Sequence, residues 1–252
     1  MFFTDHLHRS IHIPCPPQRI ISLVPSQTEL LFDLGLEDRL VGVTKFCVHP
    51  DHLRAGKTVV GGTKNYRFDI IESLKPDLII GNKEENDHEG IEQLSSKYPV
   101  WMSDIYDLAD ALRMIRDLGR ITGVEDRAEV IVESIRSSFA QPLAKKGRAV
   151  YMIWENPKMV AGKNTFIDSL LALAGFENVV QSERYPIVDK EGLRSLSPEY
   201  VLLSSEPFPF AEKHRLQIQK ILPDAKILLV DGEMFSWYGS RLLLSMGYFK
   251  RL

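Results

Sequence analysis

The sequence predicts an α/β protein made of two Rossmann-like lobes, each with a parallel sheet, that are joined by one long helix. Three observations lead to this prediction. Strand-like and helix-like segments alternate along the chain, two pieces of sequence recur in the same order, and a helical pattern separates the two halves. We therefore expect an N-terminal lobe over residues 16–124, a linking helix over 125–146 and a C-terminal lobe over 147–252.

The internal repeat consists of two matches. Residues 30–38, Leu-Leu-Phe-Asp-Leu-Gly-Leu-Glu-Asp, are similar to residues 170–178, Leu-Leu-Ala-Leu-Ala-Gly-Phe-Glu-Asn. Residues 74–80, Leu-Lys-Pro-Asp-Leu-Ile-Ile, recur as residues 196–202, Leu-Ser-Pro-Glu-Tyr-Val-Leu. Each pattern alone is common in α/β proteins, but two matches in the same order favour two related lobes.

In the N-terminal half, short runs of branched apolar residues predict buried strands. Ser26-Gln27-Thr28-Glu29 fits a capping box, which predicts that a helix begins there and ends at Gly35. Strands are expected over 19–23, 40–43, 77–81 and 100–102, and further helices over 68–74, 87–97 and 108–122. Gly123 suits the left-handed residue that ends the last of these helices.

The linking helix is predicted from Val130, Ile131, Ile135 and Phe139, which fall at helical spacing among charged residues. Pro142 should kink or thin its last turn. Beyond it the alternation starts again. Strands are expected over 149–153, 179–180, 201–203 and 227–230, and helices over 167–174, 190–196, 212–221 and 240–252.

Composition narrows the classes of protein. The 252 residues are 44% hydrophobic and 26% charged, as in ordinary globular proteins, and the net charge of −3 without a basic run argues against nucleic acid as a partner. No apolar run approaches the ~20 residues that span a bilayer. Residues 1–9 contain histidines and charges where a secretory signal would be apolar. A disulfide between Cys15 and Cys47 is not favoured.

The opening of the predicted N-terminal lobe resembles a known family. Residues 19–35, Arg-Ile-Ile-Ser-Leu-Val-Pro-Ser-Gln-Thr-Glu-Leu-Leu-Phe-Asp-Leu-Gly, are similar to the opening of the helical-backbone metal-chelate receptors. Residues 40–43, the Lys-Pro-Asp motif at 75–77 and Ala-Gly-Lys at 161–163 match in the same order, so the resemblance covers nearly the whole chain. Cobalamin-binding members match best.

This resemblance implies a function. The family consists of periplasmic substrate-binding proteins of ABC importers, with two α/β lobes on one backbone helix. It implies that the chain binds a metal chelate, with a cobalamin-like corrinoid as the first expectation and a ferric siderophore or haem as the second. The expected partners are the membrane subunits of an ABC importer, and we expect a monomer.

Two acids occupy corresponding places in the two halves. Asp69 lies seven residues before Pro76, and Glu191 lies seven residues before Pro198. By themselves both fit acids in the first turn of a helix, where negative charge is favourable. The resemblance implies a docking role, because matching acids of cobalamin-binding receptors pair with arginines on the two membrane subunits. Asp69 replaces a longer glutamate there.

We expect the ligand in a cleft between the lobes, outside the carboxyl ends of the strands. Aromatic faces can cover a flat macrocycle there, and a few polar groups can fix its orientation. Phe46 matches a cleft tyrosine of cobalamin-binding receptors, but Thr63 stands where those receptors have a tryptophan, which weakens the corrin assignment. For each aromatic taken singly, core packing is the alternative. The expected ligand-binding residues are Pro25, Phe46, Tyr66, Asn82, Lys83, Glu84, Trp154, Arg184, Tyr185, Trp237 and Tyr238.

Metal ligation and catalysis have little support in the sequence. Histidines 6, 8 and 12, and the run His49-Pro50-Asp51-His52, contain possible ligands, but no second cluster completes a site. We expect no structural metal and no resident cofactor. Whether His49 is an axial ligand to the metal of a bound chelate is left open. The motifs G-x-S-x-G and H-E-x-x-H are absent, as are the glycine-rich phosphate loops, so we expect no enzyme.

Localisation leaves an alternative open. The family implies a periplasmic or cell-surface protein. The missing secretory signal instead favours an intracellular chelate-handling protein or an enzyme on the same fold, because a fold does not fix a function.

Overall fold

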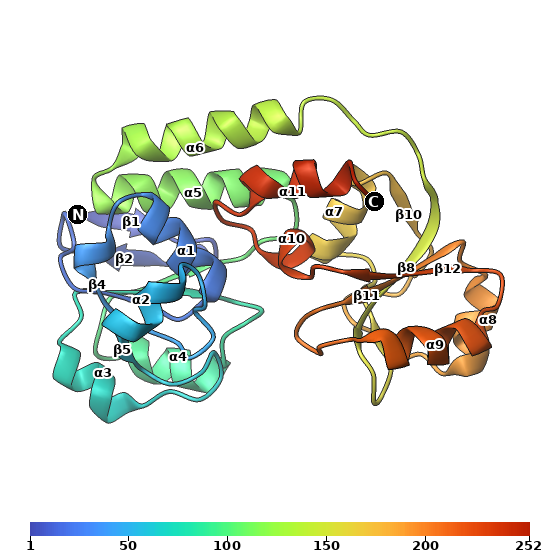
Figure 1. Cartoon of the computed structure of the whole chain (residues 1–252). Helices are drawn as coiled ribbons and strands as arrows, with labels where there is room; N and C mark the ends of the chain where they lie inside the picture. The colour runs from blue at the N-terminus through green and yellow to red at the C-terminus, as the bar shows by residue number, and fades with distance from the viewer. The chain divides into compact units, whose positions relative to one another are not determined.

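The computed structural model describes residues 1–252, except for the side chains of Arg54 and Ala55. The chain forms two compact units, each with its own α/β sheet (Figure 1). This confirms the two lobes predicted from the sequence. The N-terminal unit comprises Met1–Ile105, Ala109–Ile135 and Tyr238–Arg241, and the C-terminal unit comprises Tyr106–Leu108, Arg136–Trp237 and Leu242–Leu252.

The sheet of the N-terminal unit is parallel throughout, with the strand order β5-β4-β3-β6-β7. Three of its strands are buried along their whole length, as strands covered on both faces require. Its strands are β3 (Ile20–Ser22), β4 (Leu40–Val43), β5 (Thr58–Val59), β6 (Leu78–Asn82) and β7 (Val100–Ser103). An antiparallel hairpin of β1 (Phe2–Thr4) and β2 (Ser10–His12) precedes this sheet.

Helices α3 and α4 pack on the sheet face that carries Ile21 and Ile79. The helices that lie wholly or mainly in this unit are α1 (Pro25–Asp33), α2 (Asp51–Gly56), α3 (Phe68–Leu74), α4 (His88–Ser95), α5 (Leu108–Thr122) and α6 (Glu125–Ser138), with a 3-10 turn at Glu37–Arg39. The prediction for α5 is confirmed at both ends, and Gly123 follows it with a φ of 72°.

The sheet of the C-terminal unit has the order β10-β8-β11-β12, with parallel neighbours, and β9 pairs with β8 in the antiparallel sense. Helices α8 and α9 pack on one face through Leu193 and Ile218. The strands are β8 (Gly147–Trp154), β9 (Met159–Val160), β10 (Phe176–Asn178), β11 (Tyr200–Ser204) and β12 (Lys226–Val230). The helices are α7 (Phe166–Leu173), α8 (Lys190–Leu196), α9 (Glu212–Ile221), α10 (Glu233–Ser236) and α11 (Leu242–Phe249).

The linking helix is shorter than the sequence predicts. α6 ends at Ser138, and residues 139–146 are not helical, because Pro142 lacks the main-chain donor that would continue it. α6 lies beside α5 (Figure 1), where Gly119 faces Ala128 closely enough that a Cβ on Gly119 would lie 2.4 Å from the Cβ of Ala128. Val130 was wrongly placed in the apolar stripe, since it is 67% exposed.

Three further local predictions are wrong. The capping box does not form: α1 begins at Pro25, which already has a helical φ, so Ser26 lies inside the helix and no side chain caps Val24. The strand expected at 179–180 is instead β10. The closing helix begins at Leu242, after residues 238–241, which belong to the N-terminal unit.

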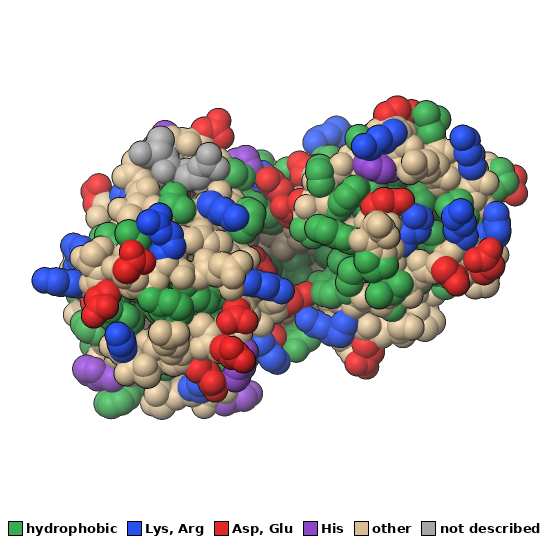
Figure 2. Space-filling model, turned by 90° about the horizontal axis from the view of Figure 1, so that it is seen from below, with side chains coloured by type: hydrophobic (Ala, Val, Ile, Leu, Met, Phe, Trp, Pro, Cys, Tyr) green, Lys and Arg blue, Asp and Glu red, His purple; other side chains and the backbone are tan. Residues whose placement is uncertain are grey.

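The surface carries no extended patch of a single charge on the face seen in Figure 2, where acidic and basic side chains are interspersed. Hydrophobic side chains gather on part of the C-terminal unit in the same view. Among the described residues, none of the helices is both long and apolar enough to span a membrane.

Candidate functional site

Parallel strands bring several predicted site residues to the carboxyl ends of the two sheets. In the N-terminal unit, Asn82 ends β6 and is 2% exposed. Its Nδ2 donates to Ser103 Oγ at 3.0 Å, and its Oδ1 accepts from the main-chain N–H of Glu84 at 2.9 Å. The amide of Asn82 therefore shapes the following loop.

Lys83 and Tyr66 are also held by protein partners. Lys83 Nζ lies 2.6 Å from Asp104 Oδ2. Tyr66 donates its hydroxyl to Thr63 O at 2.7 Å and accepts from the main-chain N–H of Asp87 at 3.1 Å. Burial raises the pKa of Tyr66 to about 12. Tyr66 thus ties two loops together as a neutral phenol.

Phe46 is the predicted aromatic of this unit with the largest open surface. It follows β4 and is 48% exposed, and the Lys45 ammonium lies 5.0 Å from its ring centroid. Pro25 lies buried in the first turn of α1, while Glu84 is half-buried. Of these three, Phe46 presents an aromatic face that a ligand can cover.

Residues 238–241, here called the strap, lie across the first turn of α1. A Cβ on Gly239 would lie 2.5 Å from Ser26 O. Tyr238 donates to Glu85 Oε1 at 2.6 Å, and Arg241 donates to both carboxylate oxygens of Glu29 at 2.9 and 2.5 Å. Tyr238, expected to contact ligand, is only 5% exposed and anchors the strap.

The charges under the strap are largely removed from water. Burial raises the pKa of Glu29, and the hydrogen bond and charge of Arg241 oppose this rise without cancelling it. Burial, followed by the nearby charge of Glu85, raises the pKa of Tyr238. The strap is therefore held by a buried ion pair and a buried phenol–carboxylate bond.

In the C-terminal unit, Trp154 ends β8 and is 38% exposed. Its Nε1 donates to Asn156 O at 3.1 Å, which fixes the indole. The ring packs edge-on against Phe208, with centroids 5.5 Å apart, and Phe208 packs in turn against Phe210 at 4.8 Å and His214 at 5.1 Å. Trp154 and Phe208 thus form a supported aromatic platform.

Sequence reasoning missed Phe208. It lies after β11, in the run Pro207-Phe208-Pro209-Phe210, so its place after a strand and beside prolines was a signal available in the sequence. Phe210 is 8% exposed and belongs to the core, which leaves the half-buried Phe208 as the platform's second ring.

Arg184 and Tyr185 lie together in a loop of the same unit. Arg184 has a φ of 62°, and its guanidinium carbon lies 5.7 Å from the ring centroid of Tyr185 and 5.9 Å from that of Tyr106. It also donates to Asn164 O at 3.0 Å. The guanidinium is therefore oriented by two aromatic rings and one carbonyl.

Trp237, at the end of α10, is 6% exposed. Its Nε1 donates to Glu206 Oε1 at 3.0 Å, and Ser236 Oγ donates to the same oxygen at 2.5 Å. Burial raises the pKa of Glu206, opposed by the bond from Ser236. Trp237 thus stabilises a buried carboxylate in the unit's interior.

The two acids expected at the transporter lie in matching places. Asp69 is the second residue of α3, and Glu191 is the second residue of α8. Both are exposed. Arg194 Nη1 lies 3.6 Å from Glu191 Oε1, whereas no ion pair of Asp69 occurs among the described residues. The geometry leaves both carboxylates accessible to a partner.

Comparison with known proteins decides the family. Residues 20–224 match the family described as periplasmic binding protein.

The chain belongs to the periplasmic binding protein family.

The relatives of this periplasmic binding protein confirm the resemblance noted in its sequence. It is 25% identical over 212 residues to an uncharacterized ABC transporter substrate-binding lipoprotein of Bacillus subtilis, covering 79% of this chain and 67% of that protein. It is also 25% identical over 240 residues to the vitamin B12-binding protein of Pectobacterium carotovorum, covering 91% and 86%. A crystal structure of a periplasmic haem-binding protein from Pseudomonas aeruginosa aligns with a TM-score of 0.78 at 26% identity, over 92% of this chain and 91% of that one.

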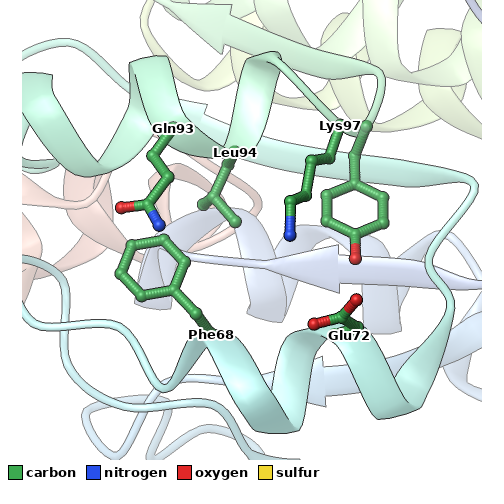
Figure 3. A pocket seen from close by; sticks show the side chains of 6 residues that line it. Phe68, Glu72, Gln93, Leu94 and Lys97 are labelled. Carbon is green, nitrogen blue, oxygen red and sulfur yellow. The ribbon is translucent and has the colours of Figure 1, made fainter.

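Two hollows described in this periplasmic binding protein lie in its N-terminal unit. One pocket, of about 20 Å³, lies between α3 and α4 and is lined by Phe68, Glu72 and Lys97 among others (Figure 3). That volume suits a single water. A larger groove beside the N-terminal hairpin contains none of the predicted ligand-binding residues.

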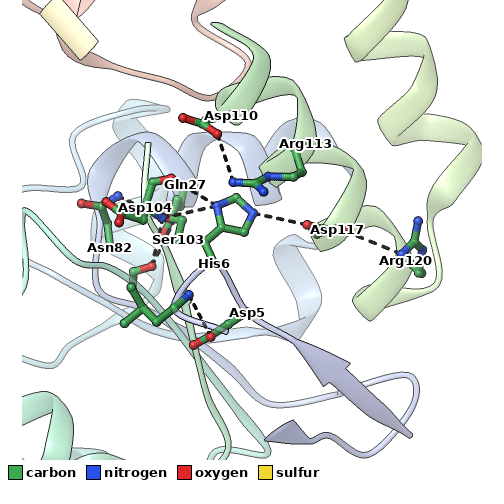
Figure 4. Close-up of polar contacts among 12 residues, drawn as sticks. Asp5, His6, Gln27, Asn82, Ser103, Asp104, Asp110, Arg113, Asp117 and Arg120 are labelled. Carbon is green, nitrogen blue, oxygen red and sulfur yellow. Dashed lines mark hydrogen bonds and ion pairs between the residues drawn. The ribbon is translucent and has the colours of Figure 1, made fainter. Parts of the chain in front are cut away.

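The histidines do not gather. His6 is buried in the N-terminal unit, where its Nε2 lies 3.3 Å from Asp117 Oδ2 and its Nδ1 lies 3.3 Å from the main chain of Asp104 (Figure 4). His8 and His12 are exposed. Across the described residues, no three His, Cys, Asp or Glu side chains group closely enough to hold a metal ion. Cys15 and Cys47 are free thiols.

Proposed function

We propose that this periplasmic binding protein captures a metal chelate and delivers it to the membrane subunits of an ABC importer. The observation that carries the proposal is the platform of Trp154 and Phe208, in which Phe208 packs edge-on against the 38% exposed indole of Trp154 at the carboxyl end of a central strand. Such a surface suits a flat macrocycle, and Phe46 offers a second open ring in the other unit. The protein acts by binding and not by catalysis.

The proposed ligand is a cobalamin-like corrinoid first, and a ferric siderophore or haem second. Relatives named as vitamin B12-binding and haem-binding proteins support this class. Of the eleven residues predicted to bind, Phe46, Trp154, Arg184 and Tyr185 are the foremost proposed contacts. Pro25, Tyr66, Lys83 and Glu84 stay proposed as further contacts. The buried Asn82, Trp237 and Tyr238 are proposed to act indirectly, because their polar atoms bond within their own units.

Tryptophan fluorescence tests the platform directly. Trp101 is fully buried and Trp237 nearly so, which leaves Trp154 as the tryptophan open to a quencher. Titration with cobalamin, haem and a ferric siderophore should quench the emission, and Trp154→Phe should remove most of that change while keeping the affinity. Trp154→Ala and Phe208→Ala should weaken binding about tenfold, at the scale of an aromatic contact.

Phe2→Ala is the matched control for these variants, since Phe2 is 74% exposed and lies in the hairpin. It should leave the titration unchanged. No change in tryptophan emission with any of the three ligands would refute chelate binding. Equal affinities of the Phe2→Ala and Phe208→Ala proteins would refute the platform alone.

Docking is proposed to use Asp69 and Glu191, with the importer's arginines as partners. Charges at such a rim steer and register the partner. Asp69→Lys with Glu191→Lys should abolish stimulation of the importer's ATPase while ligand affinity stays unchanged. Glu89→Lys is the control, because Glu89 is also the second residue of a helix, α4, and is exposed. Full stimulation of the importer's ATPase by the double variant would refute the docking proposal.

Export follows from the proposed role. A receptor for an importer has to act in the periplasm or at the cell surface, and we propose that location and a monomeric state. Cell fractionation with an antibody to this chain tests the location. A strictly cytoplasmic protein would instead support an intracellular chelate-handling role.

A further inference from the structure

The N-terminal hairpin borders a groove whose wall is the edge of a strand. Residues 9–12, which include β2, form one side, and residues 95–100, between the end of α4 and the start of β7, form the other. The groove has a volume of about 430 Å³, which is in the usual range of binding pockets, and is open to solvent. It lies entirely within the N-terminal unit.

The hydrogen-bond register of the hairpin shows which main-chain groups face the groove. Met1 and Ile13 exchange two main-chain bonds of 2.8 and 2.9 Å, and Asp5 N donates to Arg9 O at 3.0 Å. Bonded pairs alternate along an antiparallel ladder, so Ser10 and His12 belong to the pairs that are not bonded to β1. Their N–H and C=O groups point outward and have no partner among the described residues.

The hairpin is held firmly enough to keep this edge in place. The Asp5 carboxylate, 3% exposed, accepts from the main-chain N–H of Arg9 at 2.8 Å and from its guanidinium at 2.6 and 2.8 Å. Arg9 also donates to Val100 O at 3.2 Å, which links the two walls of the groove. His6 fixes the turn against α5 (Figure 4). The groove is therefore preformed.

The side chains of the groove select for negative charge. Its permanently charged lining residues are Arg9 and Lys97, and no Asp or Glu lines it. Arg9 is already paired with Asp5, and Lys97 supplies the other permanent positive charge of the lining. The acid of the adjoining pocket is Glu72 of α3, which faces Lys97 (Figure 3).

We propose that this edge groove binds an extended, acidic peptide segment of a partner protein, which adds to β2 as a third strand. The outward groups of Ser10 and His12 supply the main-chain bonds, as in other cases of strand addition. Lys97 supplies charge complementarity. The site is separate from the proposed ligand contacts, so its occupancy would leave chelate binding intact.

The test uses a fluorescent, end-capped peptide that alternates Val with Asp or Glu, and the same peptide with Lys in place of the acids. Fluorescence anisotropy with the full chain should show binding of the acidic peptide and none of the basic one. Ser10→Pro should weaken binding about fivefold, because it removes one outward N–H that the hairpin ladder does not use. Lys97→Glu should weaken it about tenfold.

Two matched variants serve as controls. Thr4→Pro makes the same change on β1, at the edge that faces away from β2, and Lys213→Glu reverses an exposed charge on α9. Both should leave the affinity unchanged, and thermal unfolding should show that all four variants fold. Equal binding of acidic and basic peptides, no binding of either, or equal losses from Thr4→Pro and Ser10→Pro would overturn the proposal. A dimer in sedimentation that Ser10→Pro dissociates would assign the edge to a second copy of the chain and overturn it as well.

Discussion

The two units close the turn between a helix and the next strand in the same way. In the N-terminal unit, the side chain of Arg19 donates to Leu74 O at 2.8 Å. The main-chain N–H of Arg19 donates to the carboxylate of Asp77, also at 2.8 Å. In the C-terminal unit, the side chain of Arg148 donates to Leu196 O at 2.9 Å. The main-chain N–H of Arg148 donates to the carboxylate of Glu199 at 2.6 Å. The recurring Leu-x-Pro-acid sequence therefore encodes one three-dimensional clasp, used twice.

The copies differ where the acid differs in length. Asp77 also accepts from the main-chain N–H of Gln18 at 2.7 Å, whereas the longer Glu199 lies over Gly147, where a Cβ would be 2.5 Å from its Oε2. Gly147 has a φ of 145°, which suits glycine. A longer acid on one side of the clasp is thus matched by a missing side chain on the other.

The buried acids of the two units differ in the charge of their hydrogen-bond partners. Glu29 of the N-terminal unit has a cation, Arg241 of the strap, as its partner. Glu206 of the C-terminal unit has neutral partners, Ser236 and Trp237. Burial raises the pKa of both carboxyl groups, but only Glu29 would leave a buried charge behind if it were removed.

The largest expected effect breaks the Glu29 pair. Glu29→Gln leaves the Arg241 guanidinium, 8% exposed, without its carboxylate, and should lower the free energy of unfolding by about 3 kcal/mol. Urea denaturation at neutral pH, followed by circular dichroism, measures the change. Arg241→Met together with Glu29→Gln should recover part of the loss, since no charge is then left unpaired. A Glu29→Gln protein as stable as the parent would show that the strap is not held by this pair.

The second prediction compares the glycines of the repeat. Gly175 has a φ of 90°, and a Cβ there would lie 2.4 Å from the main-chain oxygen of Ala144. Gly35 has a φ of 74°, and its Cβ would meet the side chain of Arg127, which can move. We expect Gly175→Ala to cost about 3 kcal/mol and Gly35→Ala about 1.5 kcal/mol. Thermal unfolding of both proteins ranks them, and the reverse order would contradict this account.

The third prediction concerns the clasp itself. Asp77→Ala removes the acceptor of two main-chain N–H groups and should cost about 1.5 kcal/mol, whereas Glu199→Ala removes the acceptor of one and should cost about half as much. Denaturant titration measures both. Asp38→Ala, on an exposed acid of the 3-10 turn, is the control and should change little. Equal costs for the two clasps would mean that the number of bonds does not set their strength.

Local and repeated features were predictable from the sequence, and long-range polar contacts were not. The alternation of strands and helices, the limits of α5 and the duplication follow from periodicity and from glycine positions. The anchoring of His6 by Asp117, 111 residues away, depends on packing that no local pattern encodes. The N-terminal hairpin, although it is a local pairing of residues 2–4 with residues 10–12, also went unseen, and only its histidines were noted.

The predicted binding residues divide for the same reason. Sequence position after a strand correctly brought Asn82 and Trp154 to the ends of their sheets. Sequence position could not show that the polar atoms of Asn82 and Tyr238 form hydrogen bonds with other protein groups, or that Phe208 packs against Trp154. These contacts depend on partners distant in the sequence. Exposure and pairing, and not position, distinguish the predicted residues with open side chains from those whose polar atoms bond within the protein.

The smallest expected effect has the opposite sign and distinguishes Glu206 from Glu29. Because the folded-state pKa of Glu206 is raised, its contribution to stability is full below the unfolded-state pKa and is lost as the pH rises through the folded-state value. Glu206→Gln has no proton to lose, and its amide oxygen can still accept from Ser236 and Trp237. Relative to the parent, the variant should gain stability between acidic and neutral pH, by less than about 1.4 kcal/mol for each unit of the shift. Urea midpoints of both proteins across this range measure the difference. A variant that loses stability relative to the parent on going to neutral pH would show that the charge of Glu206 is favoured in the fold, and would contradict the raised pKa.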